Sequence, residues 1–391
     1  MTNQPHRDAF LAALNSEANS RPVCSFMMYK GLLSSSKDYV EFLEKQLALG
    51  LTPYALIPPR PPVVTNDYYN LHGMPVSFNP AVEINEWVEE RENEKFPVMV
   101  KEYHTPEGVL RAEVRQTEDW RWGDHIPLFD DYISPRAIEF IIKDEGDLPA
   151  LGYLLADPTP EDIEETRQES GPIIAFAKGH DLPIVGGWGV GADMLGWIYG
   201  FEKMVFASID QPEFLRKILR MIADWNQKRM QVLIAMGIDL YIKRTWYETC
   251  NFWSPKTFKE FIFPIIKEDI DLCHANGVKF GCFATDKAMP ILKYYAEAGL
   301  DVLIGVDPHT FDLEKTAEIL GGKVCLWGGV NGHLTVELGS EDQVREEVRT
   351  AMEVLGGKGG LILSPVDNVR EDTEISRQNV RVLIDEWEEL T

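Results

Sequence analysis

The sequence is poor in positive charge and in cysteine. Its 391 residues carry 38 Lys and Arg against 63 Asp and Glu, which gives a formal net charge of -25. Nucleic acids and anionic lipid surfaces repel such a chain, because both are bound through clustered Lys and Arg. The 5 cysteines form no C-x-x-C pair, which argues against a disulfide framework. We therefore expect neither a nucleic acid nor a membrane as a partner.

Long apolar runs are also scarce. The most apolar stretch, LPIVGGWGVGADMLGWIYGF (182–201), is as long as a membrane span but contains Asp193 and several glycines. A strand, a loop and a helix in a buried core explain it better. The N-terminal segment MTNQPHRDAF lacks the charged and apolar regions of a secretory signal. These features predict a cytoplasmic protein.

From about residue 160 onward, apolar strands alternate with helical segments. The strand-like segments IDLYIKR, VKFGCFA and LDVLIGVD are each followed by a stretch with the composition of a helix. Such alternation is typical of a parallel sheet covered by helices. Counted from RPVCSFMMY (21–29), the chain has about eight strands. This number predicts an α/β fold of the (β/α)8 TIM barrel type rather than an open doubly wound sheet.

Residues 65–135 lack the strand–helix alternation of the later chain and are predicted to be a β-rich insertion. VMVKEYH (98–104) and VLRAEVRQ (109–116) alternate in polarity and flank the turn sequence TPEG, which is the clearest hairpin signal in the chain. No flexible linker bounds this segment. We therefore expect residues 1–391 to form one barrel domain enlarged by the insertion.

Polar and aromatic residues follow the predicted strands. In a barrel, the loops after the strands carry the chemistry, so these residues are the candidates for a site. They are Trp188, Arg244, Trp246, Tyr247, Glu248, Asp286, Asn331 and Asp367. Other roles are equally consistent with the pattern, because Asp367 could cap a helix and Arg244 could form a structural ion pair with Glu248.

An ordered set of segments within residues 160–391 resembles the uroporphyrinogen decarboxylase superfamily. The segments are GIDLYIKRTWYETCNFW (237–253), VKFGCFATDKAMPILKYYAEAGLDVLIGVD (278–307), VCLWGGVNGHLTVEL (324–338) and GGLILSPVDNV (359–369). The resemblance implies a (β/α)8 barrel. It leaves two chemistries open, because the family includes both decarboxylases and methyltransferases.

The sequence departs from two well-defined branches of that family. The true decarboxylases carry Arg-Gln-Ala-Gly-Arg after the first strand, whereas residues 26–35 read FMMYKGLLSS. A porphyrinogen needs several cations for its carboxylates, so this substrate is disfavoured. The zinc-dependent methyltransferases carry His-x-Cys and a late Cys, and the alignment places Phe283 and Thr285, then Val366 or Asp367, at those positions. Zinc stays open as a cofactor although its usual ligands are absent.

The remaining resemblance is to the corrinoid-dependent methyltransferases. Such a protein moves a methyl group from a small donor, here an aryl methyl ether or a methylamine, to a corrinoid supplied by a partner protein. The predicted catalytic acids are Glu248, Asp367 and Asp286, and the predicted binding residues are Arg244, Asn331, Trp188, Trp246 and Tyr247. A decarboxylase acting on a carboxylate is the alternative. The oligomeric state stays open, with a homodimer included.

Overall fold

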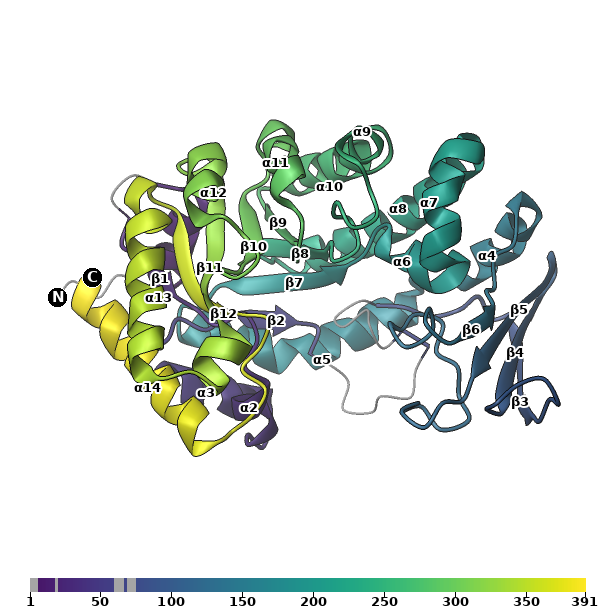
Figure 1. The fold of residues 1–391 in the computed structure, drawn as a ribbon, viewed down its shortest axis with the longest axis horizontal. Helices are drawn as coiled ribbons and strands as arrows, with labels where there is room; N and C mark the ends of the chain where they lie inside the picture. Colours follow the sequence, from purple (N-terminus) through teal and green to yellow (C-terminus); the bar gives the residue numbers. More distant parts are fainter. Residues whose placement is uncertain (1–5, 18–19, 60–66, 69–74) are drawn as a thin grey trace.

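The centre of the structure is one curled parallel sheet of eight strands (Figure 1). The computed structural model describes residues 6–17, 20–59, 67–68 and 75–391. The strands follow the order β1-β12-β11-β10-β9-β8-β7-β2. They are β1 (Val23–Cys24), β2 (Ala55–Ile57), β7 (Ile184–Gly189), β8 (Leu240–Arg244), β9 (Lys279–Phe283), β10 (Val302–Val306), β11 (Cys325–Asn331) and β12 (Leu361–Val366).

The predicted number of parallel strands is confirmed, whereas the predicted closure into a barrel is not shown. Within the described ranges, no ladder joins β1 to β2, the strands at the two ends of the order. A backbone hydrogen bond from Thr52 N to Cys24 O, 2.9 Å long, links the segments. Pro53 and Pro58 flank β2. Because a proline nitrogen carries no hydrogen, neither residue can donate to a ladder with β1.

Helices cover the outer face of this sheet. The longer ones are α3 (Tyr39–Ala48), α5 (Pro160–Gly179), α8 (Pro212–Ala235), α10 (Phe263–Ala275), α12 (Leu313–Leu320), α13 (Glu341–Val354) and α14 (Glu374–Leu390). The chain also forms the shorter helices α2 (Lys30–Ser34), α4 (Leu148–Leu154), α6 (Asp193–Leu195), α7 (Phe201–Asp210), α9 (Pro255–Thr257) and α11 (Leu292–Ala298). In the part of the chain that the structure describes, no helix has the length and apolarity needed to cross a bilayer.

The side chains of each strand alternate between two cores. On β8, Leu240 and Ile242 belong to the cluster inside the curl, whereas Tyr241 belongs to the layer between strands and helices. This follows from the period of two residues in a strand. The same alternation assigns Lys243 to the helix-facing side and Arg244 to the inside.

The helix α1 (His6–Leu14) lies at the amino ends of the strands. Its Phe10 packs edge-on against Trp327 of β11, with ring centroids 5.4 Å apart. Its Arg7 forms an ion pair with Asp239, which precedes β8, at 2.6 Å. Because α1 occupies this end, a ligand that enters the curl has to come from the carboxyl ends.

A second sheet of four antiparallel strands lies beside the first (Figure 1). Its strands are β3 (Glu83–Glu89), β4 (Val98–Thr105), β5 (Gly108–Arg115) and β6 (Ala137–Glu139). The predicted hairpin is confirmed, because β4 and β5 pair in the register Thr105 to Gly108 across a short turn. Residue 65, the predicted start of the insertion, lies outside the described residues.

Candidate active site

Arg244 ends β8 on the inner side of the curled sheet, and its guanidinium group is the centre of the candidate site. The side chain is buried between aromatic rings. Its guanidinium carbon lies 3.9 Å from the ring centroid of Trp246 and 4.8 Å from that of Trp197. Contacts of this kind with tryptophan faces stabilise a cation.

Two carboxylates neutralise this arginine. The Arg244 Nη2 atom donates to Asp131 Oδ1 at 2.8 Å and to Asp131 Oδ2 at 3.0 Å. The Nε atom lies 3.1 Å from Asp193 Oδ2. Asp193 begins α6, whereas Asp131 lies between β5 and β6 of the second sheet. The cluster of Arg244, Asp131 and Asp193, called the arginine cluster below, therefore connects the two sheets.

Asp193 is a buried acid whose charge can change near neutral pH. Tyr247 N donates to its Oδ1 at 2.8 Å, and Trp246 N lies 3.3 Å from its Oδ2. Burial raises the pKa of Asp193 to about 7, an effect that Arg244 opposes and the nearby Glu248 reinforces. Strongly shifted acids of this kind are typical of functional sites.

Asp131 is the more accessible carboxylate of the arginine cluster, because its side chain is 30% exposed. It also accepts hydrogen bonds from the Tyr247 hydroxyl at 2.8 Å and from Trp197 Nε1 at 3.0 Å. Burial, and then the charge of Asp131, raise the pKa of Tyr247. The phenol therefore remains a hydrogen-bond donor at physiological pH.

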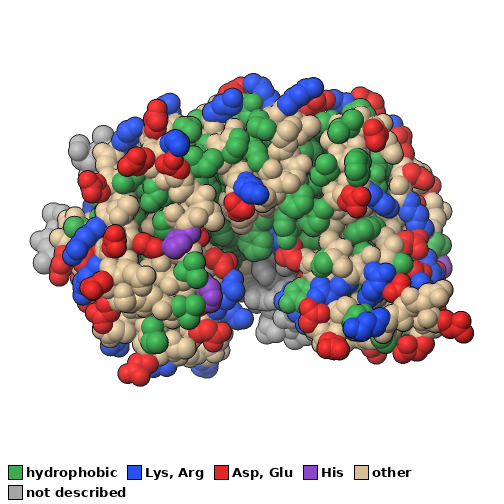
Figure 2. All heavy atoms as spheres, in the orientation of Figure 1, with side chains coloured by type: hydrophobic (Ala, Val, Ile, Leu, Met, Phe, Trp, Pro, Cys, Tyr) green, Lys and Arg blue, Asp and Glu red, His purple; other side chains and the backbone are tan. Residues whose placement is uncertain are grey.

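An aromatic wall continues from the arginine cluster into the curl. The rings of Trp188 and Phe283 have centroids 5.6 Å apart, and Trp246 meets Phe283 edge-on at 5.5 Å. Among the described atoms, the buried Nε1 of Trp246 has no hydrogen-bond partner. Figure 2 shows a hollow in this face of the molecule, bordered by apolar side chains, between α2 and α3 on one side and the second sheet on the other. The predicted residues Arg244, Trp188, Trp246 and Tyr247 thus lie in one connected group.

Glu248 is next to this group but on the other side of β8. Its Oε1 atom accepts a hydrogen bond from Ala192 N at 2.7 Å. It lies in the helix-facing layer with Lys243, which forms an ion pair with Asp269 at 2.8 Å. Burial raises the pKa of Glu248, whereas Lys243 opposes that shift. The ion pair with Arg244 that the sequence allowed is not formed, because Asp131 and Asp193 bind the guanidinium group.

This placement predicts a mild effect for Glu248→Gln. Glutamine keeps an oxygen for Ala192 N, so the turn that carries Asp193 should hold its position. We expect catalytic activity within about threefold of the wild-type value, since the hydrogen bond to Ala192 N is kept. Steady-state rates in the activity assay described under the proposed function measure this. A loss of a hundredfold or more with unchanged stability would contradict the placement and restore Glu248 as a catalytic acid.

The other predicted residues lie elsewhere along the carboxyl ends of the strands. Asn331 Nδ2 donates to Asp307 Oδ2 at 2.8 Å, and its Oδ1 accepts from Leu334 N at 2.7 Å. Asp367 is half-exposed and forms an ion pair with Arg370. Asp286 is exposed after β9. The structure brings none of these three into contact with the arginine cluster.

The residues at this site do not fit zinc. Within the described ranges, no group of three or more His, Cys, Asp or Glu is placed to hold a metal ion. In the arginine cluster, the guanidinium group already lies between the two carboxylates. Cys282 faces the helices instead, and burial raises the pKa of its thiol far above its usual range.

Sequence reasoning missed Asp131, Asp193 and Trp197. A signal for Asp193 existed, because it is the single charged residue in the stretch 182–201 and an acid in such a stretch is buried only when it has partners. Asp131 gave no comparable signal. Its contact with Arg244 joins positions 113 residues apart in the sequence.

The structure has a curled parallel sheet with polar groups at the carboxyl ends of its strands. It therefore belongs to the α/β class, in which the loops after the strands form the functional sites. The sequence profile described as uroporphyrinogen decarboxylase (URO-D) matches residues 157–390. The chain belongs to this family, which confirms the resemblance found in the sequence.

Solved structures extend the fold comparison to the whole chain. The structure is similar to a methyltransferase from Methanosarcina mazei, with 18% identity, a TM-score of 0.60 and coverage of 98% of both chains. A B12-independent methionine synthase from Shewanella sp. W3-18-1 matches with 12% identity and a TM-score of 0.42, over 55% of this chain and 63% of that one. No curated protein matches the sequence.

Proposed function

We propose that this protein is a cytoplasmic methyltransferase that moves a methyl group from a small donor to the corrinoid of a partner protein. The donor is an aryl methyl ether or a methylamine. The proposal includes closure of the curled sheet into a (β/α)8 barrel. Two observations support it, namely the likeness in fold to a methyltransferase over nearly the full length of both chains and the chemistry of the arginine cluster.

The observation that carries the proposal is the adjustable charge of the arginine cluster. When Asp193 is protonated, the charges of Arg244 and Asp131 cancel. When Asp193 is ionised, the cluster has a net charge of about -1. Because the pKa of Asp193 is about 7, this change of charge falls in the physiological pH range. The electrostatic effect of the guanidinium group on a bound substrate therefore depends on one buried proton.

The buried cation suits the negative charge that develops when an aryl ether loses its methyl group. The carbon–oxygen bond breaks, and its electron pair stays on the oxygen as a phenolate. The new bond to the methyl carbon takes its electron pair from the cobalt(I) corrinoid of the partner. The positive charge of Arg244 would stabilise the phenolate, as preorganised charges do in other active sites. The phenolate then takes a proton from water.

The aromatic wall would hold the donor. Trp188, Phe283 and Trp246 offer ring faces and edges on which an aromatic donor can pack. A methylammonium donor could use the same rings through cation–π contacts, with Asp131 as the counter-charge. A substrate with several carboxylates finds less support, because the arginine cluster has only one cation and two carboxylates.

A spectroscopic assay tests this proposal. The purified protein is incubated with cob(I)alamin and a panel of aryl methyl ethers and methylamines. We expect conversion to the methylcobalamin spectrum with at least one donor, and no conversion without the protein. The absence of conversion with every donor, together with release of carbon dioxide from a carboxylate without any corrinoid, would favour the decarboxylase instead.

A further inference from the structure

Three large apolar side chains are exposed near the carboxyl end of β11. They are Leu334, Leu338 and Ile375, which are 52%, 65% and 56% exposed, and they are called the η5 patch below. Leu334 belongs to η5 (Gly332–Glu337), the helical turn after β11, and Leu338 directly follows it. Asn379 of α14 donates from Nδ2 to the backbone oxygens of η5 and of the turn after it, at 2.9–3.5 Å. Ile375 lies one helical turn before Asn379 on the same side of α14.

The η5 patch is held on a fixed support. The buried Glu337 accepts hydrogen bonds from the backbone nitrogens of Arg370 and Glu371 and pairs with His333. These bonds tie η5 to the segment between β12 and α14. Exposed leucines on an ordered support leave apolar surface in water, and such surface commonly marks an interaction site.

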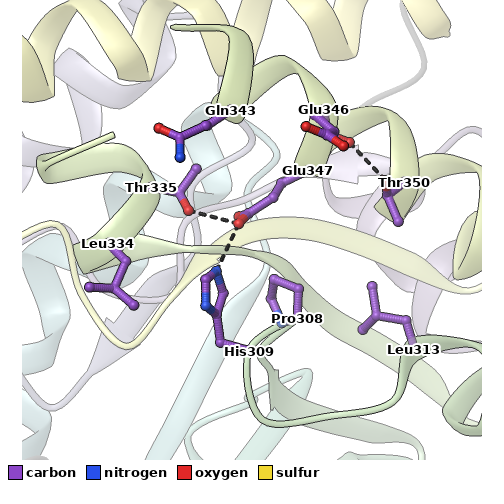
Figure 3. Close-up of a pocket in the computed structure, with 9 residues that line it drawn as sticks. All are labelled: Pro308, His309, Leu313, Leu334, Thr335, Gln343, Glu346, Glu347 and Thr350. Atoms are coloured by element: carbon purple, nitrogen blue, oxygen red, sulfur yellow. Dashed lines mark hydrogen bonds and ion pairs between the residues drawn. The ribbon is translucent and has the colours of Figure 1, made fainter. Parts of the chain in front are cut away.

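A pocket of about 330 Å³ borders the η5 patch (Figure 3). It lies between α12, α13 and η5, and Leu334 belongs to both features. Its floor contains Glu347, whose Oε1 accepts from Thr335 Oγ1 at 2.7 Å and pairs with His309 at 3.0 Å. Glu346 also lines the pocket. In the described part of the chain, no ion pair is found for its carboxylate.

The chemistry of this pocket fits a long basic side chain. Pro308, Leu313 and Leu334 provide apolar contact for an aliphatic stem, whereas Glu346 and Glu347 offer negative charge for its head. Lys and Arg have this amphipathic character. Further exposed acids nearby are Glu341, Asp342, Glu371 and Glu374. A complementary surface therefore has an apolar centre and basic groups around it.

We infer that the η5 patch and this pocket form the docking surface for the protein that carries the methyl acceptor. The inference depends on the proposed function for the identity of that partner. Its place at the mouth supports it, because Glu347 Oε2 also accepts from the backbone nitrogen of Asn331, the last residue of β11, at 2.8 Å. A second copy of this chain is a poor occupant, since each copy carries a formal net charge of -25.

The experiment compares a protein-bound acceptor with a free one. The probes are a small corrinoid protein reconstituted with hydroxocobalamin and reduced, and free cob(I)alamin. Leu338→Asp and Glu346→Lys are each expected to raise the KM for the corrinoid protein about tenfold or more, a loss of about 1.4 kcal/mol in binding. Transfer to free cob(I)alamin should not change. Ile209→Asp is the matched control, because Ile209 on α7 is 72% exposed and lies away from η5.

Binding and assembly are measured on the same variants. Calorimetric titration with the corrinoid-free partner should show the same weakening for Leu338→Asp and Glu346→Lys, so the surface is tested even if no methyl transfer is found. Failure of the wild type to methylate either acceptor would count against the proposed function alone. Unchanged KM and binding in both variants, or conversion of a dimer to a monomer by Leu338→Asp, would overturn the docking inference.

Discussion

Replacing Arg244 with methionine is expected to lower the free energy of unfolding by about 3–5 kcal/mol and to reduce methyl transfer at least about a hundredfold. The substitution leaves Asp193 buried without its cation and removes the hydrogen-bond donor from Asp131. Stranding a buried charge costs more than the ion pair itself contributes, because the remaining carboxylate has lost its water without compensation. Urea unfolding at pH 8, followed by tryptophan fluorescence, measures the stability.

A second substitution separates the stranded charge from the lost donor. In Arg244→Met combined with Asp193→Asn, the buried group is neutral, so much of the lost stability should return. Methyl transfer should stay low, because the guanidinium group is still absent. Equal destabilisation in the single and double variants would show that Asp193 is not the group that Arg244 neutralises.

The activity of the wild type with an aryl methyl ether is expected to fall about tenfold per pH unit above pH 7, as the buried carboxyl group of Asp193 ionises. The pKa of Asp193 is raised to about 7, first by burial. Below this pH the arginine cluster is neutral, whereas above it the net negative charge opposes a phenolate. In Asp193→Asn the group cannot ionise, so the fall in activity above pH 7 should disappear. Values of kcat/KM between pH 6 and pH 9 measure the effect, and an unchanged limb in the variant would assign the titration to another group.

Stability provides an independent test of the same pKa. The folded value of about 7 lies above the ordinary 3.8, so between these values the folded state binds more protons than the unfolded state. The contribution of Asp193 to stability therefore falls as the pH rises from about 4 to about 7 and is constant above that range. The stability of the wild type relative to Asp193→Asn should decrease by an amount on the order of 4 kcal/mol over this range. Parallel stability profiles for the two proteins would contradict the shift.

Single strands and hairpins could be predicted because each depends on the sequence of one short segment. The strand β8 follows from an apolar run between two helices, and the β4–β5 hairpin follows from alternation around TPEG. The position of Arg244, Trp246 and Tyr247 at one mouth follows from the rule that parallel strands end on the same side. None of these inferences needs knowledge of distant contacts.

The side of β8 on which the Glu248 side chain lies could not be predicted from the sequence in the same way. Alternation assigns Lys243 and Arg244 to opposite sides of β8, but the strand ends at Arg244. Beyond it the chain turns, and the period of two no longer predicts the direction of a side chain. The hydrogen bond from Ala192 N to Glu248 decides it, and this contact exists only in the folded chain.

The sequence by itself determined the family, the count of parallel strands, the hairpin of the insertion and the aromatic character of the mouth. Only the tertiary structure decided which acids neutralise Arg244. Asp131 reaches it from the second sheet, and Asp193 reaches it from α6 with its carboxylate fixed by two backbone nitrogens. The physical reason is that strand and helix patterns record burial along the chain, whereas the charge of the buried Asp193 depends on neighbours that folding brings from 53 and 54 residues away.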